Sequence, residues 1–211
     1  VECFAELARQ EAREVDVVVT NHAMLAIDAI SEIDTLPEHE CVIIDEAHEL
    51  DARITSATTA ELSPRSLTLA ANRAGPLGAE GKDSRLKDLA EQWRITTEDL
   101  PDGRWTELDQ AADSELSAIA ELLSSLRATL KDAPEGEATN EPETAAERNN
   151  LRNHLATLEE TVHRIQEVFD TDDPAAQDDV VWLDRNERYG DTLQVAPLSV
   201  EYCIDTFPAR I

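Results

Sequence analysis

The stretch Cys41-Val42-Ile43-Ile44-Asp45-Glu46-Ala47-His48 joins four consecutive apolar residues directly to an acidic pair. A short β-branched run of this kind is typical of a strand that is buried on both faces of a parallel sheet. In open α/β folds, ligands bind at the carboxyl ends of such strands. We therefore expect Asp45 and Glu46 to lie at the edge of a parallel sheet, where they can act on a ligand.

The residues before this stretch predict further parts of the same sheet. A helix is expected over 2–14, and the run Val17-Val18-Val19 has the composition of a second buried strand. Asn21 then stands where a helix N-cap is expected, before an apolar helix that extends to Ile30. Strands and helices that alternate in this way predict an α/β domain with a parallel sheet.

A helical pattern replaces this alternation after about Arg53. Ser63-Pro64 is a favourable helix start, and helices are expected over 64–73, 83–94 and 107–131, followed by a long helix beyond Pro142. Two heptad seams run along the last two helices. Because a polar loop joins the two helices, the seams predict an antiparallel helical hairpin. The seam of the first helix is Leu116, Ile119, Leu123, Leu126 and Leu130. The seam of the second helix is Leu151, Leu155, Leu158, Val162, Ile165 and Phe169.

Strand-like residues return near the end of the chain. Val180–Leu183 and Thr192–Val195 flank Tyr189-Gly190-Asp191, which predicts a β-hairpin, and a short helix is expected over 199–207. The simplest architecture is one α/β domain, residues 1–53 and 180–211, interrupted by an α-helical insertion over 54–179. Both ends look cut, so we expect an internal piece of a longer protein.

Charge limits the partners that this chain can bind by itself. It has 46 acidic and 18 basic residues and a formal net charge of −28, whereas a freestanding nucleic-acid binder normally carries a basic surface. We expect weak binding to DNA by the isolated chain. The acidity favours solubility, and the alternative is an acidic face that docks a basic protein partner. With no signal peptide and no apolar run of about 20 residues, we expect a cytoplasmic protein without membrane contacts. We also expect a monomer.

The order Asp45-Glu46-Ala47-His48 after four apolar residues matches the DEAH box of superfamily-two helicases. The flanking runs, Cys3 to Arg9 and Asp16 to Leu25, resemble the sequence before that box in DinG/XPD-type helicases. Trp182-Leu183, Thr192-Leu193 and Ala196-Pro197-Leu198 resemble the return from the Arch insertion of that family. The resemblance implies a partial RecA-like parallel sheet, forming motor domain one, interrupted by an antiparallel, Arch-like helical domain.

The same resemblance implies an ATP-dependent, 5′-to-3′ DNA helicase of the DinG type, acting in DNA repair or replication on single-stranded DNA. By position, Asp45 binds the Mg²⁺ of Mg-ATP, Glu46 is the catalytic base or positions the attacking water, and His48 couples the nucleotide site to the motor. Thr20, Asn21 and His22 follow a predicted strand end and are candidates for the DNA path. The alternative for these three residues is a helix N-cap and a hydrogen-bonded histidine.

The positions of the three cysteines indicate whether this chain can hold an iron–sulfur cluster. Cys3 stands where the resemblance implies the last of four ligands of a 4Fe-4S cluster in the longer protein. Cys41, inside a predicted core strand, and Cys203, inside a predicted helix, cannot complete the set, so this chain should hold no cluster. An ordinary thiol remains the alternative for Cys3.

The chain also lacks the sequence that would hold ATP. The nearest approach to the phosphate-binding pattern G-x-x-x-x-G-K-[ST] is the run from Gly75 to Asp83, whose spacing is wrong and which no strand precedes. We therefore expect no ATP hydrolysis by the chain alone. The alternative function is an acidic helical protein-interaction module with a relic DEAH segment, and a helicase linked to an exonuclease domain is a third reading.

Three side chains in the helical part have both a structural and a functional interpretation. Trp93 and Trp105 could stack on bases, but few basic residues surround them, so packing is the better interpretation. His154 is expected to be an exposed histidine beside the heptad seam, too far from His163 to share a metal ion.

Overall fold

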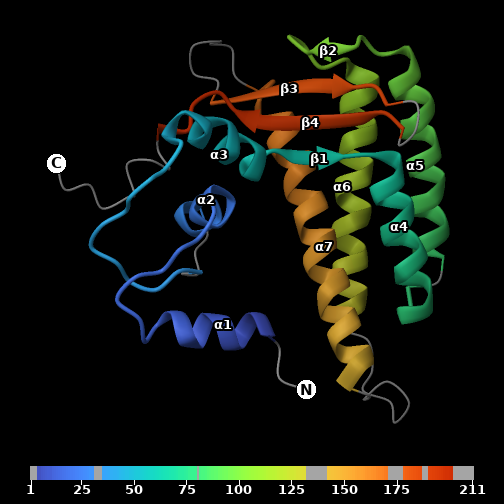
Figure 1. Cartoon of the computed structure of the whole chain (residues 1–211). Helices are drawn as coiled ribbons and strands as arrows, with labels where there is room; N and C mark the ends of the chain where they lie inside the picture. Colours follow the sequence, from blue (N-terminus) through green and yellow to red (C-terminus); the bar gives the residue numbers. More distant parts are fainter. Residues whose placement is uncertain are drawn as a thin grey trace. The chain divides into compact units, whose positions relative to one another are not determined.

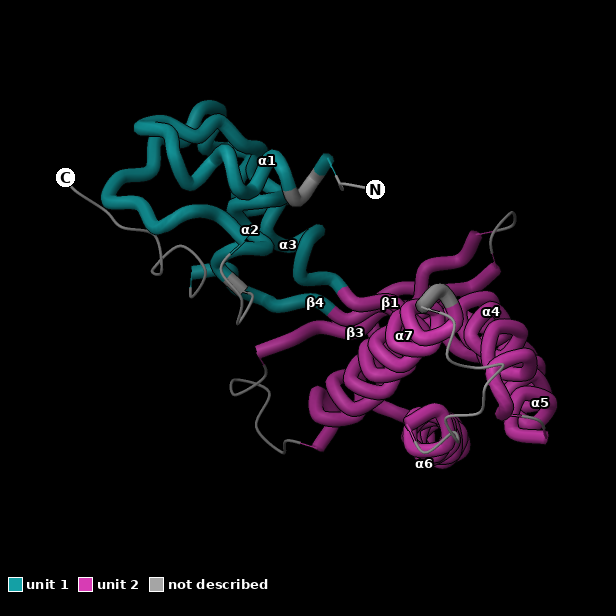
Figure 2. The backbone as a smooth tube through the Cα atoms, turned by 90° about the horizontal axis from the view of Figure 1, so that it is seen from below, with its two compact units in different colours: residues 1–59, 196–211 teal, residues 60–195 magenta. Residues whose placement is uncertain are grey.

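The computed structural model describes residues 4–30, 35–79, 81–131, 142–170, 178–186 and 190–201. The chain divides into two compact units, residues 1–59 with 196–211 (unit 1) and residues 60–195 (unit 2), which Figure 2 colours separately. Each unit has its own apolar core. Residues 180–195 lie in unit 2, together with the helices. Assignment of either unit to a motor domain or to an insertion stays a prediction.

Unit 1 consists of short helices and extended segments. Its helices are α1 (Phe4–Ala12), α2 (His22–Ile30), the 3-10 helix η1 (Ala47–Glu49) and α3 (Leu50–Thr58). Helices α2 and α3 pack against each other. The small core between them consists of five buried residues, which are Leu25, Ala26, Leu50, Ile54 and Val200.

The two strands predicted in unit 1 are not formed. Residues 17–19 and 41–44 have no regular secondary structure, and Val17 and Val19 are 77% and 94% exposed. Cys41, expected inside a core strand, is exposed as well. A strand becomes regular only when neighbouring backbone groups pair with it, and no described segment lies in register with either run. The parallel sheet predicted from these runs is therefore not part of the described structure.

Unit 2 is built around four long helices, as the sequence predicts. They are α4 (Pro64–Ala74), α5 (Lys82–Asp99), α6 (Gln110–Lys131) and α7 (Pro142–Glu167), with the 3-10 helix η2 (Gly75–Leu77) after α4. Each helix contacts two others, α4 with α5 and α7, and α6 with α5 and α7, so the four form a closed bundle. Helices α6 and α7 are antiparallel neighbours (Figure 1), which confirms the predicted hairpin.

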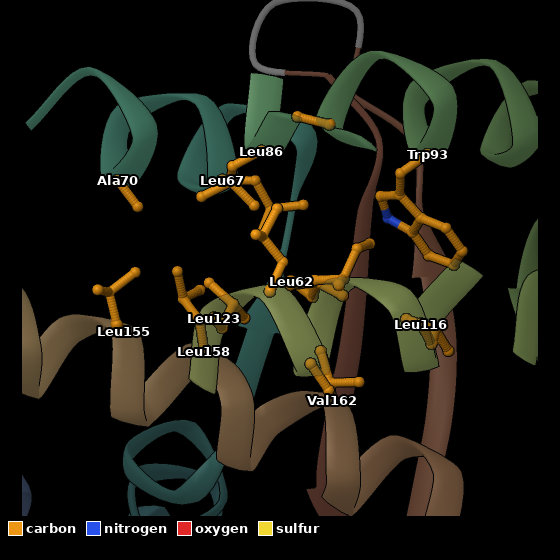
Figure 3. Packing of buried hydrophobic residues seen from close by; sticks show 14 of the residues in the cluster. Leu62, Leu67, Ala70, Leu86, Trp93, Leu116, Leu123, Leu155, Leu158 and Val162 are labelled. Carbon is orange, nitrogen blue, oxygen red and sulfur yellow. The ribbon is translucent and has the colours of Figure 1, made fainter. Parts of the chain in front are cut away.

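The heptad seams form the core of unit 2. All five seam residues of α6 are buried, and the α7 seam is buried as far as Ile165, with Phe169 partly buried at its end. Figure 3 shows Leu116 and Leu123 facing Leu158 and Val162 across the interface, with Trp93 of α5 in the same cluster. Each fully buried leucine contributes roughly 1.5–3 kcal/mol through removal of apolar surface from water.

The start of α4 shows why the sequence forms a helix there. Ser63 accepts a hydrogen bond from the Ser66 amide (3.1 Å), and the Ser66 hydroxyl in turn accepts one from the Ser63 amide (3.2 Å). Pro64 occupies the first turn, where no amide hydrogen is needed. This reciprocal capping satisfies two backbone groups that a helix end would otherwise leave unpaired.

A four-stranded sheet lies across one end of these helices (Figure 1). Its strands are β1 (Ala60–Leu62), β2 (Gly103–Arg104), β3 (Asp179–Asp184) and β4 (Thr192–Pro197), in the order β1-β4-β3-β2. Strand β1 pairs antiparallel with β4, and β2 antiparallel with β3. The β3–β4 hairpin was predicted, but β1 and β2 were not. The helix expected over 199–207 falls outside the described residues beyond Glu201.

Hydrogen bonds from two arginine side chains connect the sheet to the helices. Arg164 of α7 donates two hydrogen bonds of 2.6 Å to the carboxylate of Asp179 at the start of β3. Arg185, just after β3, donates to the carbonyl oxygen of Leu100 (2.6 Å) beyond the end of α5 and to Asp191 (2.5 Å) before β4. Both residues therefore hold the hairpin in place.

Within the described ranges, none of these helices combines the length and the apolar character that crossing a membrane requires.

Candidate functional site

The acidic motif follows an extended segment that has one covered and one open side. Val42 and Ile44 pack against the core of unit 1, whereas Cys41 is exposed and Ile43 is 93% exposed. Alternation of this kind is the side-chain pattern of a β-strand, although no described strand pairs with the segment. The apolar residues therefore anchor the segment on α2 and α3 and deliver Asp45 to the surface at its end.

Asp45 and Glu46 form a tight turn that leads into η1. Glu46 has φ 50° and ψ 45°, and it is the one non-glycine residue with a positive φ in the described structure. Two hydrogen bonds hold this conformation: the Glu46 amide donates to Asp45 Oδ1 (3.0 Å), and the Glu49 amide donates to the Glu46 carbonyl (2.8 Å). A left-handed backbone at a residue with a side chain costs roughly 1–2 kcal/mol, so the turn is held at some expense of stability.

His22 connects the second predicted motif to this turn. Its Nε2 donates a hydrogen bond to the Asp45 carbonyl oxygen at 2.9 Å, across 23 residues of sequence. The neighbouring Asn21 accepts a hydrogen bond from the Met24 amide (2.8 Å) and so caps α2. The structural roles considered for Asn21 and His22 are thus present, while Thr20 is exposed beside them. A role of these three residues in DNA binding stays a prediction.

The side chains that the motif presents are open to solvent. Glu46 and His48 are 66% and 74% exposed, and Glu46 Oε2 lies 3.3 Å from His48 Nδ1. Glu49 pairs with Arg53 one turn further on (3.2 Å). Because all of these groups are exposed, their ion pairs add little to stability and the carboxylates remain accessible to a ligand.

The donor set is suited to one part of a magnesium–nucleotide site. Mg²⁺ prefers oxygen ligands and is commonly bound through one or two carboxylates together with substrate phosphates. Asp45 offers an exposed carboxylate of this kind, and only its Oδ1 is engaged by the backbone. In the described part of the chain, no three His, Cys, Asp or Glu residues converge as a metal cluster. Asp45 therefore fits as one ligand that shares the ion with phosphate.

The expected ligand of a 4Fe-4S cluster, Cys3, lies outside the described residues.

Asp28 is a positioning residue that the sequence analysis missed. Its Oδ1 accepts hydrogen bonds from the amides of Thr35 and Leu36 (2.7 Å each) and from the Thr35 hydroxyl (3.0 Å). These bonds tie the end of α2 to the chain that leads into the extended segment. The available signal was a lone carboxylate within the apolar run from Ala23 to Ile30.

The aromatic candidates in unit 2 pack in the core, as expected. Trp93 is fully buried and Trp105 nearly so, with Trp105 Nε1 donating to the Pro101 carbonyl at 2.8 Å. His154, expected to be exposed, is half-buried instead, and its buried Nε2 has no hydrogen-bond partner among the described residues. Loss of solvent around the ring, together with the nearby Arg73, lowers the pKa of His154 below its ordinary value.

Known proteins match this chain over about half of its length. No protein-family model matches it. It is 45% identical over 108 residues to proteins of Mycobacterium tuberculosis and Mycobacterium bovis named ATP-dependent helicase DinG. It is 33% identical over 86 residues to a Bacillus subtilis protein named 3'-5' exonuclease DinG.

These matches cover different shares of each chain. They include 51% and 41% of this chain, but only 16% of the mycobacterial proteins and 9% of the Bacillus protein. The chain therefore corresponds to a small part of the relatives' length. Both groups of relatives carry the DinG name. Over about half of its length, this chain is therefore similar to a segment of proteins named DinG.

Proposed function

We propose that this chain is part of an ATP-dependent 5′-to-3′ DNA helicase, with residues 1–53 and 180–211 belonging to its first motor domain and residues 54–179 to a helical insertion. The observation that carries the proposal is the turn at Asp45 and Glu46. It presents two exposed carboxylates at the end of an anchored apolar segment and leads directly into η1 and α3. The names of the mycobacterial relatives support the same activity.

Each exposed residue of the motif has a distinct chemical part in this proposal. Asp45 holds the Mg²⁺ that accompanies ATP, because its carboxylate is free to share the ion with phosphate oxygens. Glu46 accepts a proton from the attacking water or positions that water. His48, which lies next to Glu46, relays the state of the nucleotide to the rest of the motor. Bound Mg²⁺ would supply charge neutralisation at the phosphates.

The chain supplies only these residues and not the phosphate-binding loop. Without backbone amides and a lysine to surround the phosphates, ATP would be held too weakly for turnover. We therefore propose that hydrolysis requires the longer protein. The proposal has four further parts. The substrate is single-stranded DNA, and the longer protein holds an iron–sulfur cluster that includes Cys3. The protein is a monomer and lies in the cytoplasm.

DNA-stimulated ATP turnover by a longer protein that contains this chain tests the role of Glu46. Replacement of Glu46 by Gln keeps the size and removes the proton acceptor, so turnover should fall by roughly 10²–10⁴-fold with ATP binding retained. The matched control is Glu49→Gln, which removes another exposed carboxylate three residues away and should leave turnover within about twofold. Retained turnover in the Glu46→Gln protein would remove Glu46 from the catalytic role.

The isolated chain gives an independent test of the missing loop. It should show no ATP turnover above background with or without DNA. Turnover that the Glu46→Gln substitution abolishes would contradict this expectation and would mean that the chain contains a complete site.

The alternative is an acidic interaction module that docks a basic protein through its surface charge, which the net charge of −28 favours. The two proposals differ in what Asp45 and Glu46 do. If the longer protein turns over ATP equally well with both residues replaced by amides, the motif is a relic and the interaction module becomes the better account.

A further inference from the structure

Helix α2 is attached to both ends of the backbone that leads to the acidic pair. We call residues 35–45 the anchored path. At its start, Asp28 Oδ1 accepts hydrogen bonds from the first two backbone amides of the path (2.7 Å each). At its end, His22 Nε2 donates to the Asp45 carbonyl oxygen (2.9 Å). The path therefore begins beside the last turn of α2, ends beside the first turn, and runs back along the helix that precedes it.

The length of the anchored path explains why both attachments are needed. Asp28 lies six residues after His22, which corresponds to about 9 Å along a helix axis. The ten residue steps from Thr35 to Asp45 could span roughly 33–36 Å if the backbone were fully extended. The path is thus much longer than the distance between its attachments. Its length does not fix the position of Asp45, so contacts must do so.

The contacts along the anchored path are of two kinds. Leu36, Val42 and Ile44 pack against the core of unit 1, while residues 38–41 in the middle of the path are exposed. Apolar packing is non-directional and lets a segment shift along the surface that it covers. Hydrogen bonds require a defined distance and angle. The bonds to Asp28 therefore fix the position of the path along α2, which packing alone does not.

The stability of α2 does not explain an aspartate at this position. Asp28 is the one polar residue in the run from Ala23 to Ile30, and it lies in the last turn of the helix. The helix dipole places partial negative charge at this end and disfavours an anion there. The half-buried carboxylate is instead surrounded by donors of the path, the two amides and the Thr35 hydroxyl (3.0 Å). Its hydrogen bonds serve the path and not the helix.

We propose that Asp28 is a positioning residue for magnesium–nucleotide binding, because it fixes the start of the anchored path and thereby the place of Asp45 and Glu46. Asp28 acts through the backbone of the path and not by contact with the ion. The roles of Asp45 and Glu46 rest on the proposed function, whereas the attachment rests on the hydrogen bonds of Asp28. Displacement of a reacting group by about 1 Å can lower turnover about 100-fold, so the position of the path matters to catalysis.

Hydrogen exchange followed by NMR on the 211-residue chain tests the attachment without nucleotide. Asp28→Ala removes the acceptor, so exchange at the Thr35 and Leu36 amides should accelerate at least about tenfold. Because the path transmits the loss, the Glu46 and Glu49 amides should accelerate about fivefold. Unchanged exchange at Glu46 and Glu49 would confine Asp28 to a local role and overturn the proposal.

Two further variants separate the hydrogen bonds from the charge. Asp28→Asn keeps an oxygen that can accept the same bonds, so exchange at Thr35 should stay within about threefold of wild type and exchange at Glu46 should not change. Glu38→Ala removes an exposed carboxylate from the path itself and should leave the Glu46 amide unchanged. Equal acceleration in Asp28→Asn and Asp28→Ala would show that these bonds do not hold the path.

The longer protein provides the second readout. In Asp28→Ala, the Mg²⁺ concentration for half-maximal ATP turnover should rise at least about fivefold, and turnover at saturating Mg²⁺ should fall about tenfold, because Asp45 is displaced. Asp28→Asn should restore both values to within about threefold. Ser56→Gly weakens α3 at an exposed position and should leave the half-maximal Mg²⁺ concentration unchanged. An equal shift in Ser56→Gly would mean that lost stability is the cause and would overturn the positioning role.

Failure of the positioning role is distinguishable from failure of the proposed function. If turnover depends on Glu46 but its Mg²⁺ dependence is the same in Asp28→Ala and wild type, the positioning role is wrong. If turnover does not depend on Glu46 while exchange at Glu46 still responds to Asp28→Ala, the anchored path is correct and the helicase function is wrong.

Discussion

His22 Nε2 donates a hydrogen bond to the carbonyl oxygen of Asp45, at 2.9 Å, and so joins the start of α2 to the turn that carries the acidic pair. The bond fixes the backbone at the residue proposed to hold Mg²⁺. It also shows how two motifs that are 23 residues apart can act as one unit.

Replacement of His22 by Ala should loosen the turn without unfolding unit 1. Loss of one hydrogen bond of this type costs about 1 kcal/mol, so amide hydrogen exchange at Glu46 and Glu49 should accelerate roughly fivefold. Hydrogen exchange followed by NMR measures this directly. The control is His39→Ala, which removes a similar bond from His39 Nδ1 to the Pro37 carbonyl (2.9 Å) and should leave these amides unchanged. Equal rates in wild type and His22→Ala would show that the bond does not hold the turn.

Replacement of Glu46 by Gly should stabilise the chain while it removes the proposed catalytic group. Glycine adopts the positive φ of this position without strain, and this gain exceeds its greater flexibility in the unfolded state. The free energy of unfolding should rise by about 0.5–1 kcal/mol, as measured by urea denaturation with circular dichroism. The neighbouring Ala47→Gly, at an ordinary helical φ, should lower it by about 0.5–1 kcal/mol. A loss of stability at both positions would argue against strain at Glu46.

Leu67 and Leu69 of α4 form a matched pair for the core of unit 2. Leu67 is fully buried, whereas Leu69, two residues later, is 53% exposed. Leu67→Ala should lower the free energy of unfolding by about 2–5 kcal/mol, because it leaves a cavity against α5 and α7, and Leu69→Ala should cost less than about 1 kcal/mol. Tryptophan fluorescence during urea denaturation reports on this unit, since Trp93 and Trp105 are buried within it. Similar losses for the two variants would mean that α4 is packed differently.

His154 should make stability depend on pH. Its pKa is lowered in the folded chain, so the unfolded chain takes up the proton first as the pH falls. The stability contributed by neutral His154 is therefore present above its ordinary pKa of 6.5 and is lost as the pH falls through the lowered value. Urea midpoints on either side of pH 6.5 should differ less in His154→Gln than in wild type.

The cause of the lowered pKa can be tested separately. Removal of the nearby positive charge in Arg73→Gln should raise the pKa of His154 in an NMR titration, whereas Arg65→Gln at the start of α4 should not change it. An unchanged pKa in Arg73→Gln would leave loss of solvent as the whole cause.

The sequence alone determined the helices of unit 2 and several details of their ends. Leu116, Leu123, Leu155 and Val162 recur at spacings that only a helix can bring to one face, so their burial followed from periodicity. The Ser63 cap and the Asn21 cap depend on residues within three positions of each other. Such local interactions are visible in sequence because they do not depend on the path of the rest of the chain.

Only the tertiary structure decided which strands form. The β-branched runs at Val17–Val19 and Val42–Ile44 have strand composition, yet no described strand pairs with them. Ala60–Leu62, whose composition does not indicate a strand, pairs with Leu193–Val195. Pairing depends on a partner brought from far along the chain, and composition cannot reveal whether that partner arrives. The hydrogen bond from His22 to Asp45 has the same origin, because it joins residues that only folding brings together.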